Sequence, residues 1–264
     1  MKTIIAIPVY KEQPDRPELT SLRQCLTVLS KHTICMVVPE NLNTEIYQAE
    51  FQKHDVPFRK ENFNPDFFQS IDGYNQLLMS KHFYERFADF DYLLIYQLDA
   101  YVFRDELDEC CAKGYDYIGA PFQRVNGRLD DENSGNGGFS LRKITSFIDI
   151  FSYKGKLLTW KGLQCYHRYR GPLHKPWLIL SGLFGRCNSV QSLMADTDAE
   201  DLFYVTLKHK RKGKWKIPNS AEAMFFSFEQ SPSVLFQRTK RLPFGCHGWL
   251  KYEYDSFWKQ YIPL

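Results

Sequence analysis

The chain has 264 residues, 44% of them hydrophobic, enough to bury a substantial core in one large domain or two small ones. A net charge of +3 excludes a global nucleic-acid footprint, and no apolar run of 18 residues predicts a membrane-spanning helix. The seven cysteines are odd in number and include no Cys-x-x-Cys pair. We therefore expect neither a disulfide framework nor a structural zinc site, and a cytoplasmic location is favoured.

The N-terminal residues predict a strand, a helix and a second strand. Residues 3–9 are apolar and β-branched, as in a buried strand. One basic residue precedes them, so we expect a first strand here and not a signal peptide. A helix is expected from Glu18, because leucines recur at near-helical spacing through Leu29. Residues 33–38 predict the second strand, and a right-handed crossover should make the pair parallel.

The centre of the chain predicts a helix followed by a strand buried on both faces. Residues 69–83 fit a helix, and Gly73 inside it indicates a close approach to the backbone at this position. Residues 92–98 are almost continuously apolar, as in a parallel sheet covered by helices. The strand ends in one carboxylate, Asp99, where open α/β sheets gather their ligands.

The C-terminal half has a weaker pattern. We expect a strand at residues 116–119, a polar and Gly-rich ordered loop at 123–138, and a helix at 141–151. A further strand is expected at 223–228, and the aromatic tail should pack back on the domain. Residues 152–192 show no assignable pattern. No linker or repeat divides the chain, so a single domain is expected.

Five segments in order resemble the GT-A glycosyltransferases, in particular bacterial family-2-like transferases and related uncharacterised domains. They are AIPVYKE (6–12), the long segment 74–103, GNGGFSLR (135–142), AEDLFY (199–204) and PFGCHGW (243–249). The resemblance implies an α/β fold, one GT-A-type domain over residues 1–264 with a mostly parallel central sheet flanked by helices. Residues 1–103 would be the nucleotide-sugar-binding half and 104–264 the acceptor and catalytic half.

The resemblance also implies donor-binding residues at the first strand and at the helix before the central strand. By position in the motifs these are Ile7, Pro8, Val9, Tyr10, Ser70, Tyr74, Asn75 and Lys81. The loop beside the donor sugar and the acceptor would contain Asn136, Gly137 and Gly138.

The metal-binding motif of the resembling enzymes matches only in part. The DxD-type position is Asp99-Ala100-Tyr101, which lacks the second carboxylate. Mn²⁺ or Mg²⁺ would stabilise the leaving diphosphate as a Lewis acid, and one carboxylate can suffice when phosphates supply other oxygens. We expect a metal site that is weak or dispensable, with His247 as a second ligand. Two literal Asp-x-Asp strings, at 89–91 and 196–198, are interpreted as surface and helix-capping residues.

Glu200 and Asp201 resemble the acidic pair of inverting GT-A enzymes, in which a carboxylate deprotonates the attacking hydroxyl. We expect a helix that opens at Asp198 and keeps the base ionised through its N-terminal dipole. Asp201 is preferred over Glu200 as the base. The implied reaction moves a sugar from a nucleotide donor, expected to be a UDP-sugar, to a glycan or lipid-linked acceptor in polysaccharide biosynthesis.

A basic segment, residues 208–216, holds six Lys or Arg side chains and Trp215. It predicts peripheral contact with an anionic membrane at its inner face and no binding of nucleic acid. Two alternatives stay open: a retaining transferase, and a non-catalytic glycan- or nucleotide-binding protein with a degenerate site. A nucleotidyltransferase is disfavoured, because the loop at residues 10–14 contains no glycine.

Overall fold

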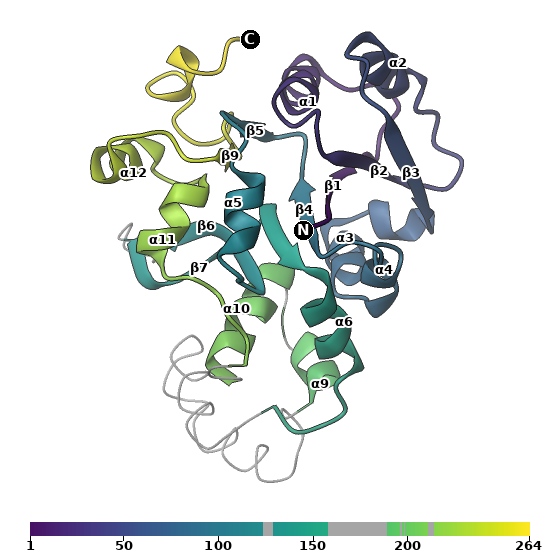
Figure 1. Cartoon of the computed structure of the whole chain (residues 1–264), viewed down its shortest axis with the longest axis vertical. Helices are drawn as coiled ribbons and strands as arrows, with labels where there is room; N and C mark the ends of the chain where they lie inside the picture. The colour runs from purple at the N-terminus through teal and green to yellow at the C-terminus, as the bar shows by residue number, and fades with distance from the viewer. Residues whose placement is uncertain (124–128, 158–188, 196, 198, 211–213) are drawn as a thin grey trace.

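The computed structural model describes residues 1–123, 129–157, 189–195, 197, 199–210 and 214–264. The N-terminal part contains, in order, β1 (Thr3–Pro8), α1 (Arg16–Val28), β2 (Thr33–Pro39), α2 (Glu45–Lys53), β3 (Phe58–Phe63), η1 (Pro65–Phe68), α3 (Ile71–Leu78), α4 (Lys81–Glu85) and β4 (Tyr92–Tyr96). The C-terminal part contains β5 (Ala100–Val102), α5 (Leu107–Ala112), β6 (Tyr117–Gln123), β7 (Leu129–Lys143), α6 (Ile144–Ser152), α9 (Val190–Ala195), α10 (Glu200–Lys210), α11 (Ser220–Phe226), β8 (Ser227–Phe228), α12 (Pro232–Thr239), β9 (Gly245–His247) and η3 (Trp258–Gln260) (Figure 1).

Six strands form the main sheet, in the order β3-β2-β1-β4-β7-β6. Strands β1 to β4 are parallel, and only β7 runs antiparallel to its neighbours β4 and β6. The predicted α/β fold with a mostly parallel central sheet is therefore confirmed. A second, three-stranded sheet has the order β5-β9-β8 and lies at the edge of the first.

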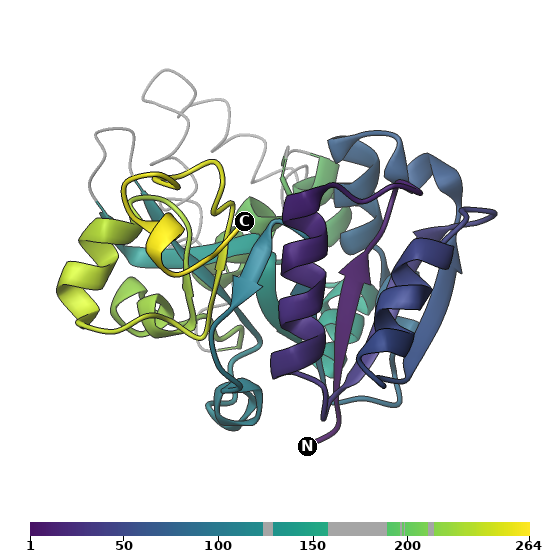
Figure 2. The same cartoon turned by 90° about the horizontal axis from the view of Figure 1, so that it is seen from above.

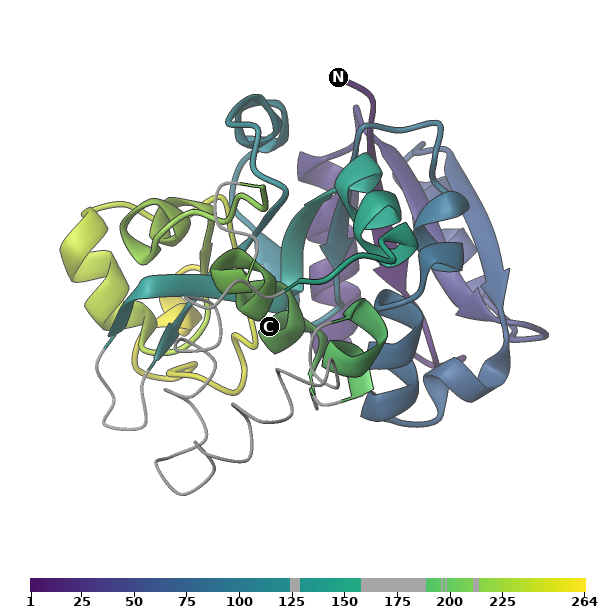
Figure 3. The same cartoon turned by 90° about the horizontal axis from the view of Figure 1, so that it is seen from below.

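Helices cover both faces of the main sheet, which is why β1, β2 and β4 are almost continuously apolar. Successive strand residues point to opposite faces. Ile5 and Ile7 of β1 pack into the core that includes α1, α2 and α5, whereas Ile4 and Ala6 pack into the core that includes α3, α4, α6 and α10. Figure 2 shows α1 and α2 on the first face, and Figure 3 shows α4 and α6 on the other.

The C-terminal tail packs back on the domain, as predicted. Trp249, Trp258 and Ile262 are fully buried in a third cluster beside the small sheet. The ring of Phe103, just after β5, stacks on Trp258 with centroids 5.6 Å apart. This packing fixes β9, which lies between β5 and β8, against the main sheet.

The first helix begins two residues earlier than its leucine pattern predicts. Asp15 is the N-cap, and its Oδ1 accepts a hydrogen bond from the Glu18 amide at 2.9 Å. The Glu18 carboxylate in turn accepts from the Asp15 amide at 2.8 Å. This reciprocal capping box starts the helix at Arg16, with Glu18 as its third residue.

The prediction of one continuous helix over residues 69–83 is wrong. The segment is divided into α3 and α4, because Ser70 and Ser80 each cap a new helix start, at Gly73 N and Phe83 N. The close approach expected at Gly73 is confirmed: a Cβ there would lie 2.6 Å from the backbone oxygen of Asp66 in η1.

Three predictions in the C-terminal half are wrong. Residues 129–138 belong to the long strand β7 and not to a loop, because pairing with both β4 and β6 overrides the poor strand propensity of Gly, Asn and Ser. Strand β7 continues to Lys143, so the following helix, α6, starts at Ile144 and not at 141. Residues 220–226 form helix α11, capped by Asn219, and only 227–228 are a strand.

Other expectations concern residues that are only partly described. Asp196, Asp198 and most of 152–192 lie outside the described residues. The five cysteines in the described part of the chain are buried free thiols, which agrees with the expected lack of disulfides. No helix in the described ranges has the length and hydropathy needed to span a bilayer.

We expect Gly73→Ala to destabilise the fold by about 1–3 kcal/mol, because its Cβ would collide with backbone that cannot move aside as a side chain would. This loss should exceed the gain in helix propensity of about 1 kcal/mol. Urea denaturation measures the free energy of unfolding. Gln76→Ala, at an exposed position of the same helix, is the control and should change stability by less than about 0.5 kcal/mol. A Gly73→Ala variant as stable as the parent would contradict the assigned packing of η1 on α3.

Candidate functional site

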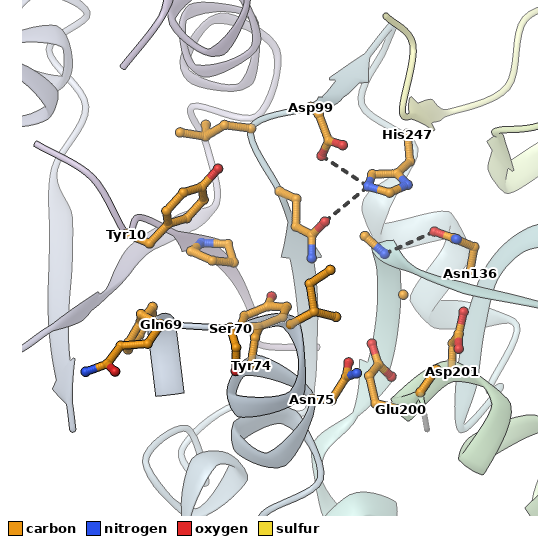
Figure 4. Close-up of a pocket in the computed structure, with 18 of the residues that line it drawn as sticks. Tyr10, Gln69, Ser70, Tyr74, Asn75, Asp99, Asn136, Glu200, Asp201 and His247 are labelled. Carbon is orange, nitrogen blue, oxygen red and sulfur yellow. Dashed lines mark hydrogen bonds and ion pairs between the residues drawn. The ribbon is translucent and has the colours of Figure 1, made fainter. Parts of the chain in front are cut away.

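A cavity of about 630 Å³ opens at the carboxyl ends of β1 and β4, between the main sheet, α3 and the start of α10 (Figure 4). Its volume is within the range of small-molecule sites. Its lining residues come from six separate segments and are Pro8, Tyr10, Glu18, Phe68, Gln69, Ser70, Ile71, Tyr74, Asn75, Gln97, Leu98, Asp99, Asn136, Gly137, Gly138, Ala199, Glu200, Asp201 and His247.

Most of the residues singled out from the sequence line this cavity. The structure thus brings the first strand, the α3 segment, Asp99, the glycine loop, the acidic pair and His247 into one place. The predicted residues that line it are Pro8, Tyr10, Ser70, Tyr74, Asn75, Asp99, Asn136, Gly137, Gly138, Glu200, Asp201 and His247.

Other predicted donor-binding residues lie elsewhere. Val9 and Ile7 point into the hydrophobic core, because they alternate along the chain with Pro8 and Tyr10. Ala100 is fully buried, and Tyr101 packs against Trp249 in the third cluster. None of these four residues is part of the cavity lining.

Lys81 is also outside the cavity lining. Its Nζ forms an ion pair with Glu85 one helical turn away, at 2.7 Å, and both side chains are largely exposed. Ser70 lines the cavity, but its hydroxyl is already engaged as the N-cap of α3. The serine therefore positions the start of this helix at the cavity edge.

The two-residue spacing expected of a DxD-type motif is present, but shifted by two positions. Gln97 and Asp99 both line the cavity, and Gln97 was not among the predicted residues, because a DxD-type motif that begins at Asp99 has its second acid after that residue. The chain turns after β4, where Ala100 N donates to the Gln97 carbonyl at 2.8 Å, and this turn directs Gln97 and Asp99 to the cavity.

His247 reaches this motif through the small sheet. Strands β5 and β9 pair antiparallel with Ala100 opposite His247, and Gly248 N donates to the Asp99 carbonyl at 3.0 Å. The Nε2 atom of His247 lies 3.1 Å from Asp99 Oδ1 and 3.1 Å from Gln97 Oε1 (Figure 4). Backbone pairing thus joins two segments that are far apart in the chain.

A second carboxylate contacts the other ring nitrogen of the imidazole. Glu229 is 7% exposed, and its Oε1 lies 3.3 Å from His247 Nδ1. Burial lowers the pKa of His247, but the hydrogen bonds and charges of Asp99 and Glu229 outweigh it and raise the pKa to about 10. At neutral pH and without a metal the ring is a cation. Its charge also holds the pKa of Asp99 below the usual range, against the opposing effect of burial.

The atoms around His247 Nε2 fit a divalent cation. Adjacent ligands of an octahedral Mg²⁺ lie about 3 Å apart, and Nε2 lies at about this distance from both Asp99 Oδ1 and Gln97 Oε1. The contact of Glu229 with Nδ1 matches the carboxylate that commonly orients a metal-ligating histidine. Within the described ranges, no three His, Cys, Asp or Glu side chains form a metal-binding group, so the set is two such residues and one amide.

The charge of the cavity is mostly negative. Its lining includes the carboxylates of Glu18, Asp99, Glu200 and Asp201, and Glu18 is neutralised by Lys11 at 2.8 Å. No Lys or Arg is among its lining residues in the part of the chain that the structure describes. A diphosphate could enter such a cavity only with positive charge beside it, from His247 or from a bound cation.

Two glycines of β7 make room for the functional side chains. A Cβ on Gly137 would overlap Glu200 Oε1, and a Cβ on Gly138 would overlap the imidazole of His247. The neighbouring Asn136 accepts a hydrogen bond from Gly138 N through Oδ1 at 3.1 Å, which fixes this turn of the backbone. The glycines were predicted to admit a ligand, and the structure shows that they admit two side chains of the protein itself.

Glu200 forms a buried ion pair with Arg142. Arg142 has no exposed surface, and its Nη2 donates to Glu200 Oε1 at 2.9 Å. The rings of Tyr117, Tyr204 and Phe147 surround the guanidinium within 6 Å of its carbon. Arg142 was not among the predicted site residues, because its role depends on a partner in α10.

Asp201 has a different environment. The described residues give it no basic partner, and its Oδ1 accepts only from Leu202 N, at 2.7 Å. Burial, and after it the negative charge of Glu200, raises the pKa of Asp201 to about 7. The expectation that the helix N-terminus keeps this carboxylate ionised is therefore wrong in direction. Asp201 gains and loses its proton near neutral pH, as a general base requires.

A family model described as "Protein of unknown function (DUF5672)" matches residues 57–247. The chain belongs to this family. No curated protein matches it. The matched region includes the Gln97-x-Asp99 motif, both glycines, the acidic pair and His247.

Solved structures show which fold the chain has. Mouse xyloside xylosyltransferase 1, in its apo form, has a TM-score of 0.51 at 13% identity, covering 94% of this chain and 98% of its own. Galactosyltransferase LgtC, solved with donor and acceptor sugar analogs, has a TM-score of 0.50 at 14% identity, covering 92% of this chain and 86% of its own. The fold is that of the GT-A glycosyltransferases.

We expect Glu229→Gln to lower the pKa of His247 from about 10, because the ring loses one of the two carboxylates that stabilise its charged form. NMR titration of the imidazole resonances in metal-free protein measures this pKa. Asp255→Asn, at an exposed carboxylate paired only with Lys259 among the described residues, serves as the control and should leave it unchanged. An unaltered His247 pKa in Glu229→Gln would show that the two side chains are not in contact.

Proposed function

We propose that this protein is a glycosyltransferase that moves a sugar from a nucleotide-diphosphate donor to an acceptor hydroxyl with inversion. The observation that carries the proposal is the single cavity in which Gln97, Asp99 and His247 lie opposite Asp201, whose pKa is close to neutral. The GT-A fold is compatible with this activity and does not by itself establish it.

The donor nucleotide is proposed to lie along the carboxyl end of β1 and the start of α3. Tyr10 is 59% exposed at this side of the cavity and offers a ring for stacking with a base. Gln69 and Ser70 lie on the same side (Figure 4), and Pro8 at the end of β1 also lines the cavity. The diphosphate would then lie against Gln97, Asp99 and His247 in the middle of the cavity.

A divalent cation held by Gln97, Asp99 and His247 would neutralise charge on the departing phosphates as a Lewis acid. Gln97 supplies an oxygen where a second carboxylate is expected, and Glu229 orients the imidazole. Because the cavity is acidic, we propose that nucleotide binding depends on Mn²⁺ or Mg²⁺ and that the cation is not dispensable.

Asp201 is proposed as the base. Its carboxylate accepts the proton of the acceptor hydroxyl while the oxygen bonds to the anomeric carbon of the sugar. The bond from that carbon to the phosphate oxygen breaks on the opposite side, and the nucleoside diphosphate leaves with the electron pair. Glu200 is less suited to take the proton, because Arg142 already donates to its Oε1.

We also propose several finer features of this activity. These are UDP as the nucleotide, a glycan or lipid-linked acceptor, a role in polysaccharide biosynthesis, a bacterial family-2-like relationship, a cytoplasmic location and one domain over 1–264. Membrane contact would have to rely on the Lys and Arg residues at 208–216. Trp215 is 3% exposed and packs on Phe147, so it cannot insert into a membrane.

Nucleotide binding tests the donor site. We expect UDP to raise the melting temperature only with Mn²⁺ or Mg²⁺ present, and a ligand at 100 times its dissociation constant stabilises by about 2.7 kcal/mol. GDP and CDP are compared under the same conditions. Asp99→Ala should abolish the metal-dependent shift, while Asp91→Ala, at the opposite end of β4, should keep it. No metal-dependent shift with any nucleotide would overturn the proposal.

The role of Asp201 makes two opposite predictions for Asp201→Asn. Turnover of the variant should fall about 10²- to 10⁴-fold, while its nucleotide affinity is kept. Turnover of the wild-type protein should decline as pH falls through about 7, because the base becomes protonated. Stability should move the other way. In the unfolded chain Asp201 ionises at about pH 4, whereas in the folded protein it ionises at about pH 7. The carboxyl therefore destabilises the fold as pH rises from about 4 to about 7. Above pH 7 the variant, which cannot ionise here, should be more stable than the wild type by about 1–2 kcal/mol.

Turnover measured by release of the nucleoside diphosphate, and urea denaturation at pH 4 and pH 8, check these expectations. Asp149→Asn on α6, which does not line the cavity, is the matched control. Full activity of Asp201→Asn would exclude it as the base, and equal stability of the two proteins at both pH values would contradict its raised pKa.

A further inference from the structure

Two polar atoms in the wall of the cavity have no hydrogen-bonding partner within the described part of the chain. They are Glu200 Oε2 and Tyr74 Oη, and both atoms are buried. Burying such atoms unpaired destabilises a fold, so they call for an explanation. Both residues line the same cavity, which indicates that a bound molecule supplies the missing partners.

The carboxylate of Glu200 is fixed with one oxygen free. Arg142 Nη2 donates to Oε1 at 2.9 Å, and the other guanidinium nitrogens are committed to Tyr84 Oη at 2.9 Å and Ser140 Oγ at 3.1 Å. Arg142 cannot turn to reach Oε2 without breaking these bonds. The ion pair thus presents Oε2 to the cavity in one orientation, and Glu200 as a whole is 5% exposed.

Tyr74 complements this oxygen with a hydroxyl group. The residue lies on α3, in the wall of the cavity opposite β7 (Figure 4). Burial raises the pKa of Tyr74, and the nearby side chain of Gln97 lowers it in part, so the phenol keeps its proton at neutral pH. The cavity therefore offers a hydrogen-bond acceptor at Glu200 and a group that both donates and accepts at Tyr74.

Charge decides which part of a donor molecule can lie here. A phosphate beside the carboxylates of Glu200 and Asp201 would be repelled, whereas Asp99 and His247, which would hold a cation for the phosphates, lie at the other side of the cavity (Figure 4). Hydroxyl groups, in contrast, can donate to a carboxylate oxygen. We propose that Glu200 and Tyr74 form the sugar-binding end of the cavity and select a neutral, polyhydroxylated donor sugar over an anionic one, an inference that rests on the proposed glycosyltransferase function.

Glu200 is in this view a specificity-determining residue, and its neighbour Asp201 is the base. A buried site that pairs with a substrate hydroxyl strongly rejects analogues that leave it unpaired. A sugar carboxylate near Glu200 would add repulsion between like charges. The two adjacent acids of α10 would thus have separate roles. Arg142 orients Glu200 for sugar selection, and Asp201, which has no such ion pair in the described part of the chain, acts as the base.

Isothermal titration in the presence of Mn²⁺ tests this inference with UDP, UDP-glucose, UDP-galactose, UDP-xylose and UDP-glucuronate. If another nucleotide binds best, the same series is made on that nucleotide. The measured quantity is the ratio of the dissociation constant of the nucleotide to that of each nucleotide sugar. We expect at least one neutral sugar to bind more tightly than UDP, and the glucuronate at least about 10-fold more weakly than UDP-glucose.

Two variants separate sugar binding from folding. Glu200→Gln keeps the size of the side chain and an oxygen for Arg142, and should weaken the neutral nucleotide sugar about 10-fold while leaving UDP within about two-fold. Tyr74→Phe should weaken binding of the neutral nucleotide sugar about 3- to 10-fold. The melting temperature of this variant without ligand should equal or exceed that of the wild type, because an unpaired buried hydroxyl is removed.

Tyr96→Phe is the matched control. Its hydroxyl donates to the Ser21 carbonyl at 3.0 Å on the other face of the sheet, so the variant should lose thermal stability and keep every affinity ratio. The inference is overturned if UDP-glucuronate binds as tightly as UDP-glucose, or if no neutral sugar binds more tightly than UDP. It is also overturned if Tyr74→Phe and Glu200→Gln both keep the wild-type ratios. If no nucleotide binds at all, the proposed function fails with it.

Discussion

Residues 137 and 138 of β7 are glycines, and a Cβ at either position would occupy space that Glu200 or His247 fills. Three segments of the chain meet at this point: strand β7 of the main sheet, the start of α10 and strand β9 of the small sheet. The close approach sets the shape of the cavity, because each side chain lies directly against backbone and cannot move toward it. The residues that line the cavity depend on this contact for their positions.

The charges around β7 are arranged in two separate groups. Asp99 and Glu229 surround the imidazole of His247, and Arg142 holds Glu200 within a ring of aromatic side chains. A fully buried ion pair contributes little net stability, since desolvation offsets most of its attraction. Its effect here is orientation: it leaves Glu200 with one free oxygen, whereas Asp201 has no basic hydrogen-bonding partner in the part of the chain that the structure describes. Two adjacent acids thereby acquire different chemistry.

The small sheet gives the fold its second essential contact. Pairing of β5 with β9 places His247 opposite Ala100, next to the carboxyl end of β4. The aromatic tail packs over these strands and includes two fully buried tryptophans, Trp249 and Trp258. Burial of such large apolar side chains is a strong stabilising contribution, and it fixes a histidine near the C-terminus beside a motif at the centre of the chain.

The sequence by itself determined the α/β class, the buried strands β1, β2 and β4, and most of the residues that line the cavity. The strands follow from local periodicity, and Asp99 follows from the rule that ligands gather at the carboxyl ends of parallel strands. The other predicted cavity residues follow from the resemblance to the GT-A motifs. Only the tertiary structure decided that residues 129–138 are a strand, that Gln97 and not residue 101 accompanies Asp99, and that Arg142 and Glu229 hold Glu200 and His247. Each of these depends on a partner distant in sequence, and neither propensity nor spacing records such contacts.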